Sequence, residues 1–155
     1  LVGSEMCIRD SPGSFDPITL GHQDIIYKGL KVFDEIIIGI GENSDKKYMF
    51  SSEKRFEFVS TTFDKIKKID VKCYSGLTVD FCKENDAQFI IRGLRNPADF
   101  EFEKSIALTN REMTGIETVF LLTDSKNFFI SSSIVRDLIK NKGDYKLFIP
   151  KGLSI

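Results

Sequence analysis

The segment of residues 35–41 reads EIIIGIG and predicts a short, buried β-strand. Its isoleucines are β-branched and follow one another with little polar alternation, and Gly41 ends the run. A continuous apolar run of this kind is typical of a strand that is covered on both faces, as in a parallel sheet. We therefore expect this strand inside an α/β domain.

The elements around this strand alternate between helix and strand. Apolar spacing and turn residues predict helices at residues 51–66, 77–84, 97–113 and 131–141, and strands at 70–74, 88–92 and 117–122. This alternation predicts a doubly wound, Rossmann-like parallel sheet of about five strands with helices on both faces. Ligands of such sheets bind outside the carboxyl ends of the strands, so we look for chemistry in the loops at 12–20, 42–50, 93–96 and 123–130.

The helical spacing also predicts which side chains face the core. In the helix at 51–66, Phe56, Val59 and Phe63 recur at helical intervals. In the helix at 77–84, Leu77 shares one side with Phe81 and Cys82. Phe56, Val59, Phe63, Phe81 and Cys82 are expected to be buried, whereas core packing is one of two equal alternatives for Leu77.

Length and composition describe an ordinary single domain. The chain has 155 residues, with 22 Lys+Arg against 23 Asp+Glu, so its net charge gives no clustered basic surface for a nucleic acid. No apolar run approaches the roughly 18 residues of a membrane helix, and no signal-peptide pattern opens the chain. The three cysteines are widely spaced and there is one histidine, which argues against a zinc site and for free thiols in a reducing compartment.

The first loop, residues 12–22, reads PGSFDPITLGH and opens an amphipathic helix marked by Ile25, Ile26 and Leu30. A Gly/Pro-rich turn at a helix N-terminus presents backbone N–H groups to an anion. His22 lies on the first helical turn, where its ring can donate to a phosphate oxygen, and Gly21 leaves room for a ligand. The alternative is a plain turn in which His22 is a local helix cap.

Other loops offer further groups for anions. Lys46 follows the strand predicted at residues 35–41 in a polar loop, although it could be an ordinary solvated lysine. Arg92 and Arg95 flank a strand end, and a guanidinium suits phosphate, with an ion pair to Asp99 or Glu101 as the alternative. The three serines at residues 131–133 form a second helix N-terminus, where at least one of them should be an N-cap.

Together these motifs resemble one family. The run GSFDPITLGH at 13–22 resembles the signature of the nucleotidylyltransferase superfamily. KKYMF at 46–50, IRGLR at 91–95, DFEFE at 99–103 and ISSSIVR at 130–136 follow in matching order and spacing. From residue 12 to about residue 153, the chain is similar to the bacterial phosphopantetheine adenylyltransferase family.

The resemblance implies that ATP and 4′-phosphopantetheine are converted to dephospho-coenzyme A and pyrophosphate, a step of coenzyme A biosynthesis. It implies His22 and Lys46 as the catalytic residues. The residues expected to bind the acceptor substrate are Ser14, Lys46, Leu77, Thr78 and Arg92. The residues expected to bind ATP are Ser14, Phe15, His22, Gly93, Leu94, Arg95, Glu103, Asn127, Phe128, Phe129, Ile130, Ser131, Ser132 and Ser133.

The resemblance also implies partners. Mg²⁺ is expected to accompany ATP, held largely by phosphates and water with no metal site of protein residues. A homohexamer in the cytoplasm, built as a dimer of trimers, is expected, with no nucleic-acid or membrane partner. The attacking group is a phosphate that is already ionised, so the reaction needs positioning and charge stabilisation rather than a protein base.

The chain departs from the family pattern in three places. Phe128 stands where the family usually has a small residue, and could narrow the adenine end of the site. The chain stops at residue 155, where the family usually continues, so residues 12–155 are expected to be a C-terminally truncated domain. Residues 1–11 look like a non-native leader that fills the first-strand position, with Met6 and Ile8 on one face and Cys7 and Arg9 on the other.

Two other functions stay open at this point. A related nucleotidylyltransferase with another phosphate acceptor would share the first and last motifs, but not the combination of Lys46 with the motifs at 91–95 and 99–103. An inactive copy that only binds nucleotide is the second alternative.

Overall fold

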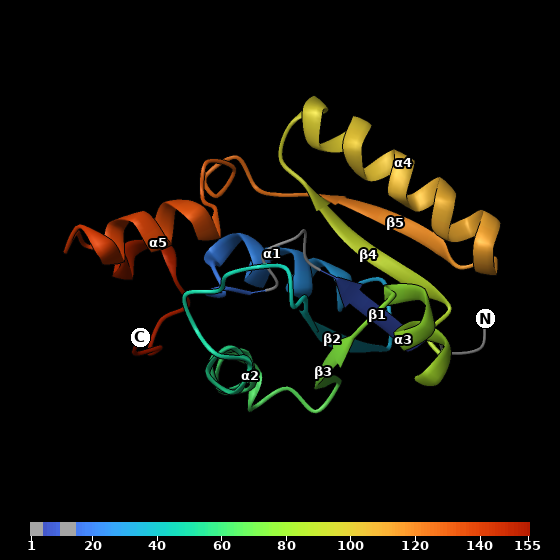
Figure 1. The fold of residues 1–155 in the computed structure, drawn as a ribbon, viewed down its shortest axis with the longest axis horizontal. Helices are drawn as coiled ribbons and strands as arrows, with labels where there is room; N and C mark the ends of the chain where they lie inside the picture. The colour runs from blue at the N-terminus through green and yellow to red at the C-terminus, as the bar shows by residue number, and fades with distance from the viewer. Residues whose placement is uncertain (1–4, 10–14) are drawn as a thin grey trace.

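A computed structural model describes the backbone of residues 5–9 and all of residues 15–155. Strands and helices alternate along the chain, as expected (Figure 1). The elements are β1 (Glu5–Arg9), α1 (Leu20–Gly29), β2 (Glu35–Glu42), α2 (Ser52–Phe63), β3 (Ile69–Ser75), α3 (Thr78–Glu84), β4 (Phe89–Leu94), α4 (Pro97–Thr114), β5 (Glu117–Leu122), α5 (Ser132–Lys140) and the 3₁₀ helix η1 (Lys146–Phe148).

The strands form one sheet of five parallel strands in the order β3-β2-β1-β4-β5. The central strand β1 pairs with β2 on one side, Cys7 opposite Ile37, and with β4 on the other, Cys7 opposite Ile90. The order of strands reverses between β1 and β4. That reversal is the switch point beyond which ligands of open α/β sheets bind. The predicted fold class is confirmed.

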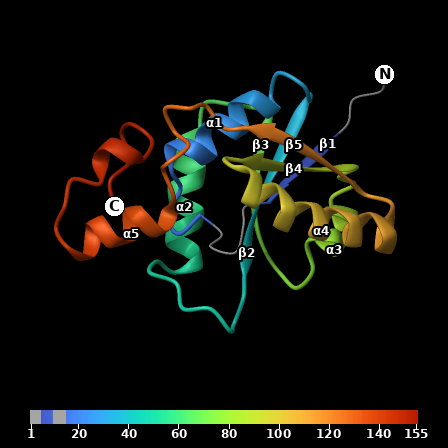
Figure 2. The same cartoon turned by 90° about the horizontal axis from the view of Figure 1, so that it is seen from above.

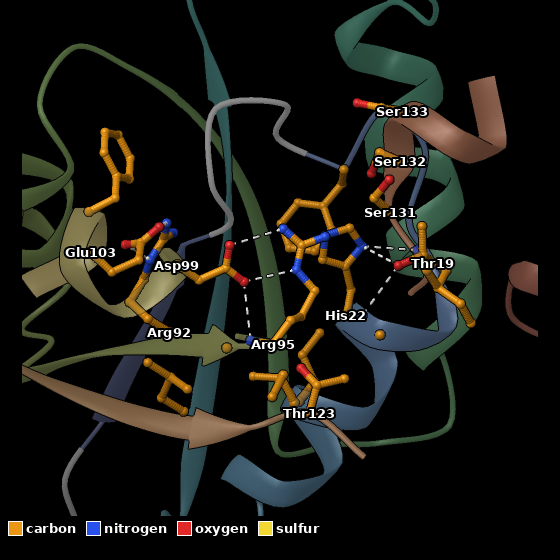
Figure 3. Close-up of a pocket in the computed structure, with 18 of the residues that line it drawn as sticks. Thr19, His22, Arg92, Arg95, Asp99, Glu103, Thr123, Ser131, Ser132 and Ser133 are labelled. Carbon is orange, nitrogen blue, oxygen red and sulfur yellow. Dashed lines mark hydrogen bonds and ion pairs between the residues drawn. The ribbon is translucent and has the colours of Figure 1, made fainter. Parts of the chain in front are cut away.

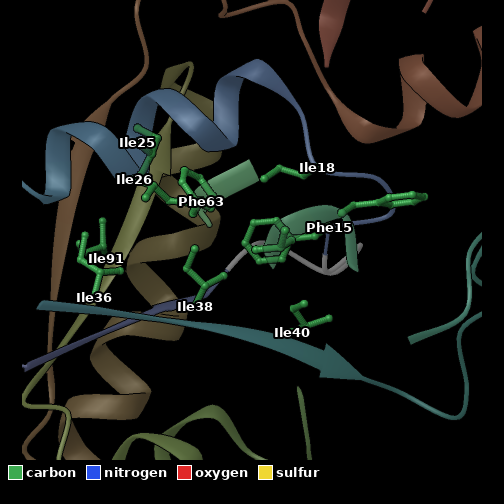
Figure 4. Close-up of a cluster of buried hydrophobic side chains, with 11 residues drawn as sticks. Phe15, Ile18, Ile25, Ile26, Ile36, Ile38, Ile40, Phe63 and Ile91 are labelled. Carbon is green, nitrogen blue, oxygen red and sulfur yellow. The ribbon is translucent and has the colours of Figure 1, made fainter. Parts of the chain in front are cut away.

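Successive residues of β2 pack into separate cores on the two faces of the sheet. Ile36, Ile38 and Ile40 lie in the larger core, which is built from α1 and α2 (Figure 4). Ile37 lies in the smaller core with Phe81 of α3. Figure 2 shows the helices distributed over the two faces, and this alternation explains why the strand reads as a continuous apolar run.

Helix starts follow their sequence signals. Thr19, Ser51, Asn96 and Ser131 are the N-caps of α1, α2, α4 and α5, and the side chain of each accepts a backbone N–H. Gly115 ends α4 in the left-handed conformation with φ of 77°, which a residue without Cβ adopts freely. These caps fix where the functional loops end.

Several expectations about boundaries and burial are wrong. The second helix ends at Phe63 rather than residue 66, and β4 runs through Gly93 to Leu94. Val59 and Phe63 are buried as expected, but Phe56 is exposed, because the buried face of α2 passes through Arg55 and Phe58 rather than Phe56. Leu77, the N-cap residue of α3, is exposed, which excludes the core-packing alternative for it.

The expectations about residues 1–11 concern side chains that lie outside the described residues. The backbone of Glu5–Arg9 occupies the first-strand position. The assignment of Met6, Cys7, Ile8 and Arg9 to opposite faces is untested.

Candidate functional site

A cavity of about 400 Å³ lies at the carboxyl end of β4, next to the switch point between β1 and β4 (Figure 3). Its lining comes from the first loop and α1, from β4 and α4, and from the start of α5. We call it the first cavity. The predicted site residues that line it are Phe15, His22, Arg92, Gly93, Arg95, Glu103, Ile130, Ser131, Ser132 and Ser133.

The cap of α1 fixes the ring of His22. The backbone N–H of Thr19 donates to His22 Nδ1 at 3.0 Å, and the Thr19 side chain accepts the His22 backbone N–H. Because a backbone N–H can only donate, Nδ1 is an acceptor, and the neutral ring carries its proton on Nε2. His22 is therefore both the local cap and a positioned N–H donor in the first cavity.

Arg92 forms a buried ion pair with Glu103 in the wall of the first cavity. Arg92 Nε donates to Glu103 Oε2 at 2.7 Å, and Nη2 donates to Oε1. Both side chains are more than nine-tenths buried. The pairing partner is thus Glu103, not Asp99 or Glu101. Helix α4 packs against β4, and this packing brings Glu103 of α4 to Arg92 of β4 beside the cavity.

Arg95 takes the alternative partner considered for it. Its Nε donates to Asp99 Oδ2 at 3.0 Å, and its backbone N–H donates to the same oxygen at 3.1 Å. Asn96 caps α4 between them, and both charged side chains line the first cavity. The pair is partly exposed, so solvent screens it and it contributes little to stability.

The three serines of α5 have three different partners. Ser131 accepts the N–H of Ile134 as the N-cap, which confirms that one of the serines has this role. Ser132 Oγ donates to the carbonyl oxygen of Pro17 at 2.9 Å, and Ser133 accepts from Arg136. Arg136 Nη1 also donates to the carbonyl oxygen of Asp16 at 2.7 Å, so α5 is joined to the first loop at several points.

Lys46 and Leu77 lie in a second cavity of about 830 Å³. This second cavity is lined by the loop after β2, the start of α2 and the end of β3. Lys46 therefore lines a different cavity from Arg92, although both were assigned to the phosphate of the acceptor. A substrate that meets both residues must extend from one cavity to the other.

Buried side chains hold the loop that carries Lys46. Asp16 is buried and accepts the backbone N–H groups of Met49 and Phe50, each at 2.9 Å. Earlier in the loop, the hydroxyl of Tyr48 accepts the N–H of Asn43 at 3.1 Å. The Tyr48 ring packs 4.1 Å from the guanidinium of the buried Arg55. The loop is thus fixed on both sides of Lys46.

Some predicted residues line neither cavity. Leu94 and Thr78 are buried, and Thr78 forms a hydrogen bond of 3.0 Å with Tyr74. Phe128 and Phe129 are half-exposed, so Phe128 does not narrow the first cavity. Asn127 is buried; its backbone N–H donates to Asp124 in the turn that leads the chain past Phe128. Ser14 lies outside the described residues.

The structure also adds residues to the site that had no assigned role. Thr19, Asp99, Thr123 and Arg136 line the first cavity, and Tyr48, Arg55 and Tyr74 line the second. Thr19, Asp99 and Arg136 stand inside motifs that were recognised, so their position in the motif was a signal. Thr123 follows β5 and Tyr74 lies within β3, and neither stands inside a recognised motif.

A cavity at the switch point of a parallel sheet, lined by arginines and by a histidine on the first turn of α1, is the arrangement expected of a nucleotidyltransferase. The family model for cytidylyltransferase-like proteins accordingly matches residues 11–138.

Within this class, the chain belongs to the phosphopantetheine adenylyltransferase family. It is 58% identical to phosphopantetheine adenylyltransferase of Flavobacterium johnsoniae over 144 residues, covering 93% of this chain and 95% of that one. It is 44% identical to the protein of that name from Bacteroides fragilis, covering 93% and 96%.

Solved structures share the fold. A bifunctional NMN adenylyltransferase/ADP ribose pyrophosphatase from Francisella tularensis matches with a TM-score of 0.71 and 13% identity, over 97% of this chain and 45% of that one. Nicotinic acid mononucleotide adenylyltransferase of Plasmodium falciparum matches with a TM-score of 0.66 and 17% identity, over 96% and 91%. At these identities the likeness shows the fold alone.

Proposed function

We propose that the first cavity binds ATP and that the chain transfers its adenylyl group to 4′-phosphopantetheine, giving dephospho-coenzyme A and pyrophosphate. The observation that carries this proposal is the convergence of distant motifs in one cavity at the switch point. The identity to phosphopantetheine adenylyltransferases over nearly the whole chain supports the choice of acceptor.

The proposed reaction is an in-line displacement at the α-phosphorus of ATP. A phosphate oxygen of 4′-phosphopantetheine forms the new P–O bond, and the bond to the β-phosphate breaks as pyrophosphate leaves. Because the attacking phosphate is ionised at neutral pH, the protein needs to align two anions and stabilise the charge that develops. A protein base is not required.

His22 is the proposed donor to the α-phosphate. Its Nε2 proton is fixed by the contact of Nδ1 with Thr19, so the donor is oriented before substrate binds. The positively charged side chains of Arg95 and Arg136 and the N-terminus of α5 surround the same cavity. These groups favour the polyphosphate of a nucleotide.

Lys46 is the proposed second catalytic residue, and the second cavity is the proposed site of the pantetheine arm. The exposed Leu77 offers apolar surface there, and the loop carrying Lys46 is held by Asp16. In this arrangement the acceptor phosphate lies between Arg92 and Lys46, which requires the acceptor to span both cavities. This assignment of Arg92 stays a prediction.

Mg²⁺ is proposed to enter with ATP. Among the described residues, no group of three or more His, Cys, Asp or Glu side chains is placed to hold a metal ion. Mg²⁺ commonly keeps several waters and binds through substrate phosphates. The residues of the first cavity therefore fit an ion whose ligands are mainly water and the phosphates of the nucleotide. When bound, the ion would neutralise phosphate charge, while the cavity residues align the reactants.

Assembly and location are also proposals. Exposed apolar side chains on α4, among them Phe102, Leu108 and Met113, support burial of this helix against further copies in a hexamer. A cytoplasmic location is consistent with the free thiol of Cys73. Within the described part of the chain, none of the helices combines the length and apolarity needed to cross a membrane.

A pyrophosphate-release assay with ATP and 4′-phosphopantetheine tests the function. We expect release with this acceptor and much less with pantetheine, which lacks the attacking phosphate. Absence of release, with ATP binding retained in titration calorimetry, would support the inactive nucleotide-binding alternative. Release with another phosphorylated acceptor alone would support the related transferase.

A further inference from the structure

Lys28, on the second half of α1, connects that helix to the end of β5. Its ammonium donates to Asp24 Oδ2 at 3.0 Å, to Asp124 Oδ1 at 2.6 Å and to the carbonyl oxygen of Leu122 at 2.7 Å. An ammonium has three N–H donors, so these contacts account for all of them. We call the group of Asp24, Lys28, Leu122 and Asp124 the Lys28 latch.

Asp24 also contacts the backbone of the segment after β5. Its Oδ2 also accepts the backbone N–H of Asp124 at 2.8 Å, so a single carboxylate oxygen meets both the ammonium and the loop backbone. Asp24 is 14% exposed and Lys28 29% exposed, so this pair is screened less than a fully exposed one, whereas Asp124 is 45% exposed and its pair with Lys28 is screened more. The latch therefore connects the side chains of Asp24 and Lys28 on α1 to the backbone of Leu122 and Asp124, and is more than an ion pair between two surface side chains.

The latch holds the start of the segment at residues 123–130. Thr123, which lies between Leu122 and Asp124, lines the first cavity, and its N–H donates to the carbonyl oxygen of Leu94 at 3.0 Å. The segment then turns through hydrogen bonds from Asn127 N–H to Asp124 and from Ile130 N–H to Asn127. Its end, Ile130, lines the same cavity.

The other end of the segment lies against the start of α1. A Cβ added to Gly21 would be 3.9 Å from the carbonyl oxygens of both Asn127 and Ile130. One helix, α1, thus supports His22 on its first turn and the latch further along. The position of the segment relative to His22 depends on both contacts.

We propose that Lys28 is a positioning residue for the nucleotide: through the Lys28 latch it holds residues 123–130 against α1 and so shapes the wall of the first cavity on which ATP binds. This inference rests on the proposed function only for the identity of the nucleotide. The second cavity, the proposed site of the pantetheine arm, is built from other loops, so the latch should affect the binding of ATP more than the binding of the acceptor.

The test uses the full chain with Lys28→Met, which keeps the length of the side chain and removes its donors. Titration calorimetry with ATP, at a temperature where both proteins are folded, should show an affinity about tenfold weaker than wild type, the scale expected for losing charge-assisted hydrogen bonds that order a binding loop. The KM for ATP should rise similarly, while the KM for 4′-phosphopantetheine and kcat stay within about twofold.

Matched variants separate positioning from stability. Lys54→Met breaks an exposed pair with Glu57 on α2 and should leave the ATP affinity unchanged. Lys28→Arg should recover most of the affinity, because a guanidinium can reach the same acceptors. Asp124→Asn is a milder change that keeps an acceptor, and it should weaken ATP binding in the same direction if Lys28→Met fails to fold.

Two outcomes overturn the inference. One is an unchanged ATP affinity in both Lys28→Met and Asp124→Asn, even with lower melting temperatures, since the latch would then be structural only. The other is an equal rise in KM for both substrates. If wild type binds ATP but releases no pyrophosphate, the proposed function fails, while the calorimetric comparison still decides the role of Lys28.

Discussion

At the scale of single residues, the structure gives His22 and Arg92 definite electrostatic partners. Thr19 sets the tautomer of His22, and Glu103 neutralises Arg92 inside the first cavity. In both cases a group expected to meet phosphate is first held by the protein. Such preorganisation is what makes a donor effective when charge develops in a transition state.

His22→Ala should lower kcat far more than it weakens ATP binding. A donor aimed at developing charge acts mainly in the transition state, and losing one costs roughly 10²–10³ in rate. Steady-state kinetics and ATP calorimetry on the same preparation measure the two effects. A near-normal kcat would mean that His22 serves only as the cap of α1.

Arg92→Ala should affect both stability and acceptor binding. It leaves the buried carboxylate of Glu103 without its partner, which costs about 3–5 kcal/mol in the free energy of unfolding. We also expect a larger rise in KM for 4′-phosphopantetheine than for ATP. Arg92→Lys should rescue this KM poorly, because a lysine ammonium cannot form the paired hydrogen bonds of a planar guanidinium.

The double variant Arg92→Met, Glu103→Leu separates these two roles. It should recover most of the stability in urea unfolding, because neither charge remains buried alone. It should not recover the acceptor KM. Full activity in the double variant would show that Arg92 is a structural residue.

At the scale of elements, the Lys28 latch makes the packing of α1 against β5 dependent on charge. The hydrogen bond from Lys28 lowers the pKa of the Asp124 carboxyl, with the charges of Lys28, Lys126 and Lys31 adding to it. Partial burial alone would lower the pKa of Lys28, but its hydrogen bonds to Asp124 and Asp24 outweigh burial and raise it.

The latch should therefore stabilise the fold across neutral pH and fail at the extremes. Because the pKa of Asp124 is lowered on folding, its contribution is present above the ordinary carboxyl pKa of about 4 and is lost as pH falls through the lowered value. Because the pKa of Lys28 is raised, its contribution is present below about pH 10 and is lost as pH rises through the raised value.

Urea unfolding of wild type and Lys28→Met at several pH values measures this contribution. The difference in the free energy of unfolding should be constant between about pH 5 and pH 9 and shrink below about pH 4. A difference that persists undiminished in acid would attribute the effect of the variant to the hydrogen bond from Lys28 to the carbonyl oxygen of Leu122, which does not titrate.

At the scale of the whole molecule, helix α4 carries many apolar side chains but leaves them largely exposed. It spans 18 residues, yet Glu103 is its one buried side chain. Phe102, Leu108 and Met113 are all exposed by 44% or more. Apolar surface of this kind on a helix at the edge of the sheet is consistent with the proposed hexamer.

Leu108→Glu should shift the protein toward smaller species. A charge at the centre of an apolar contact would be buried without a partner, so the assembly should weaken. Light scattering after size exclusion measures the mass, and ATP calorimetry should be unchanged because Leu108 lines neither cavity. A wild type that is monomeric at all concentrations would contradict the assembly proposal.

The sequence alone predicted the features that arise from interactions between residues close together along the chain. The alternation of apolar strands with capped helices is local, and it predicted the parallel sheet and nearly every element. The Gly-His run and the Ser-Ser-Ser run are also local, because helix N-termini are made by neighbouring residues. They predicted which loops meet at the switch point.

Tertiary structure alone decided which groups are partners. Arg92 pairs with Glu103 because β4 and α4 pack together, and spacing could not distinguish Glu103 from Asp99 or Glu101. Lys28 and Asp124 are separated by 96 positions and meet only when α1 lies beside β5. The sequence by itself determined the sheet and the chemistry gathered at its edge, because periodicity and capping act between neighbours; the division into two cavities and the latch required the fold, because those contacts exist only once distant segments pack.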